Sequence, residues 1–240
     1  MGKKYTNRKP FWCGIKRFLR LVTRKPKFLF IGENKEFEDR ALYLCNHVGL
    51  YGPYGLELYF PRQFKFWGIY LMAEGFKNRF YYLYNIHFHK INRVPKIFSF
   101  LVTLIAAPLM SLFYWGMQVI PTYPDARLIK TYRLSLQALN RNESIIIFPE
   151  DSNDGYNDVM TLYYSGFYVL AKKALEKGMD LSIYNLYYKR KKNTYIVDEP
   201  IKFSELLKIT PDKESMAEFI KNRANALGSL KIEKNKIVTE

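Results

Sequence analysis

The sequence contains little cysteine and histidine, and this scarcity restricts the kinds of site that it can form. Its 240 residues include two cysteines, Cys13 and Cys45, and three histidines. The cysteines do not have the short spacing of a zinc site, and two of them in a chain of this length do not indicate a disulfide scaffold. We therefore expect no metal site and a reducing compartment.

Several familiar motifs are also missing. The first 30 residues contain no uncharged apolar stretch followed by a small-residue cleavage site, so no secretory signal is expected. The phosphate-binding pattern G-x-x-x-x-G-K-[ST] and the serine-hydrolase pattern G-x-S-x-G do not occur. The sequence has no zinc knuckle, helix-turn-helix or RNA-recognition signature. These absences argue against nucleotide hydrolysis, serine hydrolysis and nucleic-acid binding.

Positive charge is abundant and concentrated at the N-terminus. The chain has 38 Lys and Arg against 22 Asp and Glu, which gives a net charge of +16 and predicts an anionic partner. Residues 1–32 contain no acid, and within them apolar side chains recur at helical spacing: Phe11, Trp12, Ile15, Phe18, Leu19 and Val22. We interpret residues 1–26 as a basic amphipathic helix at a membrane interface. The alternative is a helix that packs on its own domain.

A second apolar segment follows later in the chain. Residues 97–124 contain no charged side chain, and the apolar run is long enough to span a bilayer. Pro108 interrupts this run midway, so two short helices that break near Pro108 are the alternative to one continuous helix. Whether residues 97–120 span a bilayer stays open.

The rest of the chain alternates between short β-branched runs and helical patterns. Strands are predicted at 27–32, 41–46, 63–70, 118–123 and 144–150, and helices at 53–60, 76–85, 125–141, 165–178 and 211–228. Residues 181–190 and 193–199 resemble two strands that flank a turn near Lys191. This order predicts a single layered α/β domain over residues 27–240, with a mostly parallel central sheet flanked by helices.

Polar residues follow two of the predicted strands, where reactive groups gather in such folds. Asn46 and His47 come after the strand at 41–46, and "FPEDSN" (148–153) follows a β-branched run. Histidine is a suitable general base near neutral pH. A histidine that only caps the following helix is the alternative.

These two blocks, in this order and spacing, resemble the lysophospholipid and glycerophosphate acyltransferase family. That family has an N-H-x-x-x-x-D block and an F-P-E-G-T-R block, and this chain has "NHVGLYG" (46–52) and "FPEDSN" (148–153). Looser matches are "GMQVIPTYPDAR" (116–127) and "SGFYVLAKKA" (165–174), so the resemblance covers roughly residues 40–205.

The resemblance implies an acyltransferase that needs no cofactor besides its two substrates. It would move a fatty acyl group from acyl-CoA or an acyl-carrier protein to the hydroxyl of a glycerol-based phospholipid precursor or lysolipid, with His47 as general base and no cofactor. It would work at the cytoplasmic face of the cell membrane as a peripheral or monotopic protein, with membrane lipids and the acyl thioester as partners. Oligomeric state is not predicted.

Departures from the family pattern affect the expected site. The aspartate that orients the histidine is replaced by Gly52, and Asn153 stands where the family has an arginine. We expect a substitute carboxylate, with Asp151 as the first catalytic candidate and Glu150, Glu57 and Asp154 as others. Substrate contacts are expected from Asn46, Glu150, Ser152, Arg127 and Arg133. The alternative is a weak or inactive membrane-bound relative that only binds lipid.

Overall fold

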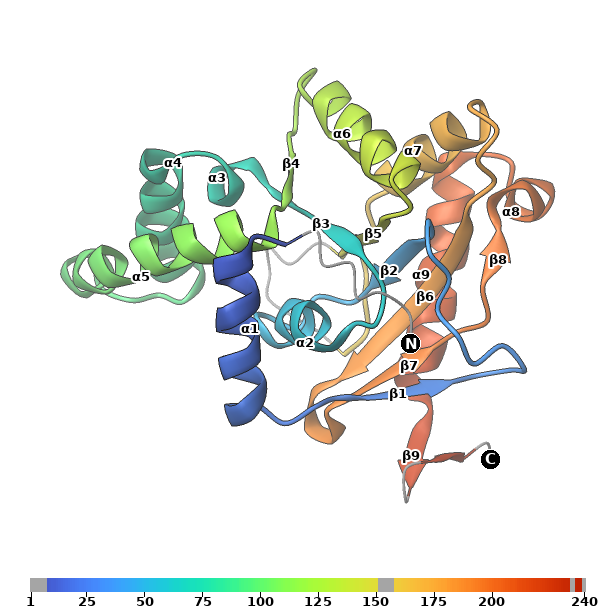
Figure 1. The fold of residues 1–240 in the computed structure, drawn as a ribbon, viewed down its shortest axis with the longest axis horizontal. Coiled ribbons are helices and arrows are strands. Elements are labelled where there is room, and N and C mark those ends of the chain that lie inside the picture. Colours follow the sequence, from blue (N-terminus) through green and yellow to red (C-terminus); the bar gives the residue numbers. More distant parts are fainter. Residues whose placement is uncertain (1–7, 151–157, 234–235, 239–240) are drawn as a thin grey trace.

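A mostly parallel mixed sheet forms the centre of the molecule (Figure 1). The computed structural model describes residues 8–150, 158–233 and 236–238. The strand order is β1–β7–β6–β2–β5–β3–β4, with β8 paired to β6. The strands are β1 (Lys27–Phe30), β2 (Leu42–Cys45), β3 (Phe64–Ile69), β4 (Ile120–Thr122), β5 (Ser144–Ile147), β6 (Ser182–Lys189), β7 (Thr194–Val197) and β8 (Ile201–Lys202).

Strand directions agree with the predicted α/β class. β6, β2, β5, β3 and β4 are parallel neighbours, whereas β7 and β8 run antiparallel to β6. β6 and β7 form the predicted pair around Lys191, joined by the short 3-10 turn η2 (Arg190–Lys192). The predicted mostly parallel sheet is therefore confirmed, and the carboxyl ends of β2, β5 and β6 lie at one edge of it.

Alternate residues of the central strands build two apolar layers, because successive side chains of a strand point to opposite faces. Leu42, Leu44 and Ile145 pack under α6 (Leu128–Asn140), α7 (Gly166–Leu175), α8 (Phe203–Ile209) and α9 (Lys213–Ser229). Tyr43 and Ile146 belong to the other layer, which includes side chains of α2 (Tyr51–Tyr59). Helices thus cover both faces of the sheet, as predicted. A separate antiparallel pair, β9 (Lys231–Glu233) and β10 (Lys236–Val238), follows α9.

The N-terminal helix α1 (Pro10–Val22) packs on the domain through one side and exposes the other. Trp12 is buried and donates from its indole Nε1 to Glu57 of α2 at 2.8 Å. Arg8 and Lys16 pair with the same carboxylate at 2.7 and 3.1 Å. Apolar side chains of α1 that remain exposed are Phe11, Phe18, Leu21 and Val22. One side of α1 therefore packs on the domain, which was the alternative to a membrane-interface helix. Membrane association stays a prediction for the exposed side.

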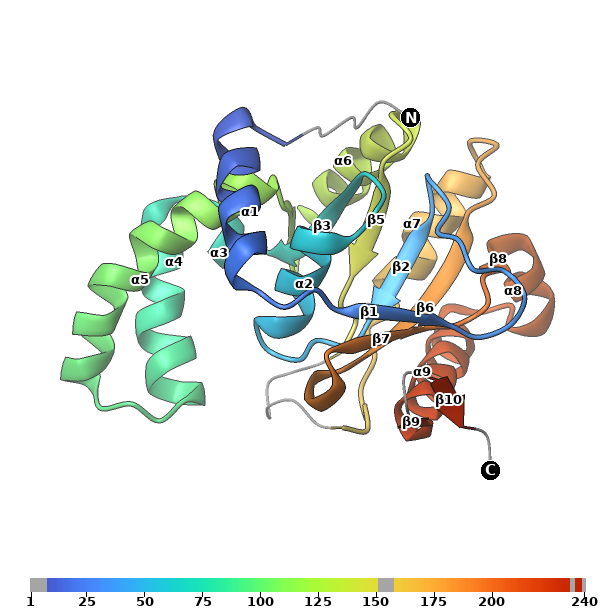
Figure 2. The same cartoon turned by 60° about the horizontal axis from the view of Figure 1, so that its bottom comes forward.

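Between β3 and β4 the chain forms a helical hairpin that projects from the sheet (Figures 1 and 2). One arm consists of α4 (Phe76–Tyr81) and the π-helix η1 (Tyr82–Ile91), preceded by the short α3 (Tyr70–Ala73). The other arm is α5 (Lys96–Met117), which continues through Pro108. Of the two alternatives for this segment, the structure has the single helix.

Candidate active site at the carboxyl edge of the sheet

The structure brings the two polar blocks together. β2 and β5 are parallel neighbours, with Leu42 opposite Ile145 and Leu44 opposite Ile147, so both blocks leave the sheet at the same edge. Directly beyond the strands, the backbone N–H of His47 donates to Oε2 of Glu150 at 2.9 Å. Glu150 is itself buried. A carboxylate from the second block therefore fixes the backbone that carries the histidine.

Asn46 lies at this edge, but its side chain faces β6. Its Oδ1 accepts the backbone N–H of Tyr188 at 2.6 Å, and its Nδ2 donates to the carbonyl of the same residue at 3.3 Å. The amide thereby continues the pairing of β2 with β6 beyond the last strand residue. Asn46 is expected from the sequence to contact substrate, whereas its observed bonds hold the backbone before His47 in place.

The imidazole of His47 packs against an aromatic side chain. Its ring meets the ring of Phe148 edge-on, with 4.9 Å between centroids. Burial lowers the pKa of His47 from its ordinary value of 6.5 to about 4, because desolvation disfavours the charged form. The side chain is therefore neutral at pH 7, as a proton acceptor must be, although a lowered pKa also makes it a weaker base.

Glu150 is held between His47 and the strand-like segment that leads into α7. It forms an isolated bridge with Tyr163, and Tyr164 donates its N–H to the carbonyl of Pro149 at 2.8 Å. Burial raises the pKa of the Tyr163 hydroxyl, and the negative charge of Glu150 acts in the same direction. Tyr163 therefore stays protonated beside the carboxylate.

Gly52 leaves room beside the histidine loop. A Cβ at Gly52 would lie 3.5 Å from the carbonyl oxygen of Asn46 and 4.0 Å from Cε1 of Phe148, which are ordinary contact distances. The Gly52 carbonyl accepts the hydroxyl of Tyr195 at 2.6 Å, which holds the start of α2. The position where the resembled family has its aspartate can thus accommodate a Cβ.

The structure also bears on the other carboxylates expected near His47. Glu57 is buried and bonds to Arg8, Trp12 and Lys16. It therefore holds the N-terminal segment and is not the carboxylate that orients His47. Asp151, Ser152, Asn153 and Asp154 lie outside the described residues, so the expected roles of Asp151 and Ser152 stay predictions.

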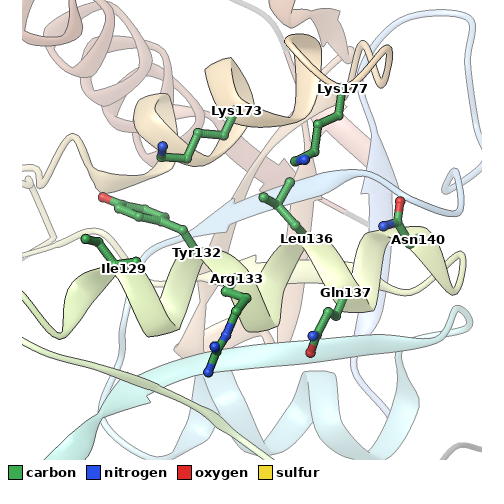
Figure 3. A pocket seen from close by; sticks show the side chains of 8 residues that line it. All are labelled: Ile129, Tyr132, Arg133, Leu136, Gln137, Asn140, Lys173 and Lys177. Carbon is green, nitrogen blue, oxygen red and sulfur yellow. The ribbon is translucent and has the colours of Figure 1, made fainter.

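The two arginines expected at the substrate make other contacts. Arg127 pairs with Asp125 at 2.8 Å and lies over the rings of Tyr70 and Tyr123, 4.8 and 4.7 Å from their centroids. Arg133 lines a groove of about 320 Å³ between α6 and α7 (Figure 3). The other residues of this groove are Ile129, Tyr132, Leu136, Gln137, Asn140, Lys173 and Lys177. None of these described contacts involves His47 or Glu150.

A cationic turn that the sequence did not assign to the site lies at its edge. Because β6 is parallel to β2, η2 leaves the sheet on the side of His47. The guanidinium of Arg190 stacks over the ring of Tyr51, 4.0 Å from its centroid, and Tyr51 begins the helix after His47. The signal was visible as the run "KRKK" (189–192), but only the strand order places it beside the histidine.

Exposed apolar side chains lie in the segments that adjoin the two polar blocks. Leu50 and Tyr51 are exposed at the start of α2, close in sequence to His47. Tyr164, which is bonded to Pro149, is exposed as well, as are Val159 and Leu162 shortly before it. Such a rim is suited to contact with the apolar part of a lipid.

Comparison with known proteins does not assign the chain to a family. No protein-family model matches it, and no curated protein is significantly similar to it. Within residues 8–150, 158–233 and 236–238, no group of three or more His, Cys, Asp or Glu side chains is arranged to hold a metal ion.

Proposed function

We propose that the protein transfers an acyl group from an acyl thioester to the hydroxyl of a glycerol-based lipid or lysolipid, with His47 as general base. The observation that carries this proposal is the bond between the His47 backbone and Glu150 at the ends of two adjacent parallel strands. It joins the two blocks on which the resemblance to acyltransferases rests. The membrane would supply the acceptor, and the exposed apolar rim would contact its acyl chain.

The proposed step needs one proton acceptor. His47 takes the proton from the acceptor hydroxyl as its oxygen attacks the thioester carbonyl carbon. The tetrahedral intermediate then collapses, the carbon–sulfur bond breaks, and the leaving thiolate takes the proton from the imidazolium. A neutral imidazole in a desolvated position is suited to the first half of this cycle.

The turn at Arg190 is the better source of positive charge for an anionic headgroup. Arg127 is paired with Asp125 and Arg133 lines a separate groove. Arg190, Lys191 and Lys192 are exposed at the same edge as His47, where a phosphate would gain charge-assisted hydrogen bonds.

Arg190→Gln should raise the KM for an anionic lysolipid several-fold and leave the KM for a neutral acceptor unchanged. Lys208→Gln on α8 is the control and should change neither KM.

The test is release of free thiol from an acyl thioester in the presence of lysolipids. We expect His47→Gln to reduce the rate by roughly two to four orders of magnitude, the usual contribution of a positioned base. His89→Gln is the matched control, because His89 lies in the projecting hairpin and bonds to the carbonyl of Val94. Thermal unfolding of both variants checks that the fold is intact. Near wild-type turnover by His47→Gln would overturn the assignment of the base.

A lipid-binding protein without chemistry is the second candidate. It is favoured by Gly52, which offers His47 no carboxylate, and by the lowered pKa of the imidazole. Such a protein would bind lysolipid and acyl thioester without releasing thiol, and His47→Gln would leave that binding unchanged. Equilibrium binding measured beside thiol release therefore separates the two candidates.

A further inference from the structure

The projecting hairpin has its polar groups inside and its apolar groups outside. On α5, Ser99, Thr103 and Ala107 are fully buried against the other arm. Ile97 and Ile105 are 70% and 69% exposed. Further exposed apolar residues of α5 are Phe98, Phe100, Leu101, Val102, Leu104, Leu109, Leu112 and Trp115. A helix in contact with water shows the reverse pattern.

The polar groups inside the hairpin are satisfied within it. Thr103 donates to the carbonyl of Ser99 at 2.6 Å, and Ser99 donates to that of Val94 at 3.0 Å. Arg79 of α4 is buried, donating to the carbonyl of Met72 at 2.7 Å and to the hydroxyl of Ser111. Small and hydroxyl-bearing residues between helices, with all donors bonded internally, are typical of helix pairs in lipid.

The exposed face of α5 continues onto α1. The rings of Phe11 and Trp115 lie 6.5 Å apart between centroids, and both side chains are exposed. Lys9 lies over the ring of Trp115, 3.7 Å from its centroid. At the other end of α5, Arg93 and Lys96 are exposed in the turn of the hairpin. Cations therefore stand at both ends of the apolar face, where anionic headgroups would meet them.

The lengths of the two arms decide how the hairpin can sit in a bilayer. α5 has 22 residues, about 33 Å at 1.5 Å per residue, and among the described residues it is the one helix long and apolar enough to cross a membrane. The charge-free segment of the other arm, α4–η1, is shorter. Between Arg79 and Lys90 the charge-free stretch 80–89 would extend only about 15 Å even with the rise of an α-helix, and most of it belongs to the more widely wound π-helix η1. That is half the ~30 Å hydrocarbon core, so this arm cannot cross it.

We propose that the hairpin is a monotopic anchor: α5 lies in the apolar layer of one leaflet, α1 lies beside it, and α4–η1 covers α5 on the water side. The partner is a bilayer with anionic headgroups. A protein groove would contact one stripe of a helix, whereas the exposed apolar residues of α5 extend over roughly half its circumference at 3.6 residues per turn. This anchoring does not depend on the chemistry at His47.

Flotation with vesicles of phosphatidylcholine and phosphatidylglycerol tests the proposal on the full chain. We expect wild-type protein to float even at about 1 M salt, where exposed charges are screened beyond ~3 Å. Ile105→Lys combined with Leu109→Lys should weaken partitioning by about a hundredfold or more, because charge in the apolar layer is expensive. Ile209→Lys, an equally drastic change at an exposed apolar position on α8, should float like wild type. Unchanged flotation of the double variant would overturn the proposal.

Site-specific labels test the depth of α5 independently of affinity. In a Cys13→Ser background, the remaining Cys45 is buried and its thiol pKa is raised by burial, so an introduced cysteine reacts alone. A nitroxide at Ile105→Cys should become accessible to oxygen and shielded from a water-soluble nickel complex when vesicles are added. A nitroxide at Lys77→Cys on α4 should stay accessible to nickel.

Two outcomes would count against the monotopic arrangement. If an impermeant maleimide reaches Arg93→Cys only after the vesicles are lysed, the hairpin crosses the bilayer. If the Ile105→Cys nitroxide is already immobilised without vesicles and light scattering gives a dimer, a second copy of the chain covers α5. Labelling of Arg93→Cys in sealed vesicles, together with a monomeric mass, supports the monotopic anchor.

Discussion

At the scale of single residues, Gly52 and His47 are the pair on which activity should depend. Gly52 occupies the position of the orienting aspartate in the acyltransferases that the sequence resembles. A Cβ there would meet only ordinary contacts, with the carbonyl of Asn46 and the ring of Phe148. The site can therefore be tested by adding the missing group as well as by removing the base.

Gly52→Asp should increase turnover if His47 is the base, because it places a carboxylate where the resembled family has one. A carboxylate beside the imidazole would hold one tautomer and stabilise the imidazolium, an effect of up to about four orders of magnitude in serine-protease triads. We expect at least a tenfold rise in kcat, measured by thiol release, and Gly52→Asn as the uncharged control should give little. A drop in activity with Gly52→Asp, in a variant that folds normally, would indicate that another group already orients His47.

The lowered pKa of His47 predicts how the rate of acyl transfer should depend on pH. The base must be neutral to accept a proton, and burial lowers its pKa to about 4. The rate should therefore stay level from neutral pH down to about pH 5 and fall only near pH 4. A fall centred at 6.5 would mean that the imidazole is solvated or carries a charged partner during turnover. In Gly52→Asp the fall should move to higher pH, because a nearby carboxylate favours the imidazolium.

The lowered pKa of His47 should also make the stability of the fold depend on pH. The pKa of His47 is lower in the folded state than the ordinary 6.5 of an unfolded chain, so the unfolded state binds more protons between pH 6.5 and 4. The free energy of unfolding should decrease as pH falls through this window. His47→Gln should lack this contribution, which denaturant unfolding at several pH values would measure.

At the scale of elements, one buried carboxylate collects several of the polar contacts that hold α1 and the residue Arg8 before it. Glu57 is 1% exposed and bonds to Arg8, Trp12 and Lys16. Gly116 of α5 allows the Trp12 ring to approach, because a Cβ there would collide with it. The position of α1 thus depends on residues far from it in sequence.

Glu57→Gln should destabilise the protein by about 3 kcal/mol, since it leaves two buried or half-buried cations without their counter-charge. Glu176→Gln, at an exposed position just after α7, should change the free energy of unfolding by less than about 0.5 kcal/mol. Denaturant unfolding measures both variants. Equal small effects would show that the Glu57 cluster contributes little to stability.

This attachment also changes how the membrane role of residues 1–26 should be tested. Deleting the segment would remove Arg8, Trp12 and Lys16 together and leave Glu57 buried without a partner. Weaker vesicle binding by such a truncation could then reflect local unfolding. Substitutions at exposed positions of α1 avoid this difficulty.

At the scale of the whole molecule, the excess positive charge should give a salt-dependent contribution to membrane binding. Arg17, Arg24 and Lys25 are exposed on or just after α1. Replacing all three by Gln should weaken binding to anionic vesicles by about 1 kcal/mol per residue at low salt. The difference from wild type should shrink at high salt and vanish on neutral vesicles. Replacing the exposed Lys172, Lys173 and Lys177 of the α6–α7 side is the matched control.

Local patterns in the sequence determined most of the elements and the two reactive blocks. Apolar periodicity and turn residues act over a few positions, and they predicted the strands before His47 and Glu150 and the strand pair around Lys191. The helices predicted at 125–141 and 211–228 are present with slightly different ends, at 128–140 and 213–229. That the blocks meet at one edge of a parallel sheet was also expected, and the pairing of β2 with β5 confirms it.

Only the tertiary structure decided which side chains share a neighbourhood. Arg190 lies beside Tyr51 because β6 pairs with β2. Glu57 bonds to Arg8, 49 positions away and just before α1, and the side-chain amide of Asn46 bonds to the backbone of Tyr188. The outward apolar face of α5 likewise depends on what its partner arm covers. These contacts join residues far apart in the chain, and a local pattern carries no information on strand order or on the partner that each face will meet.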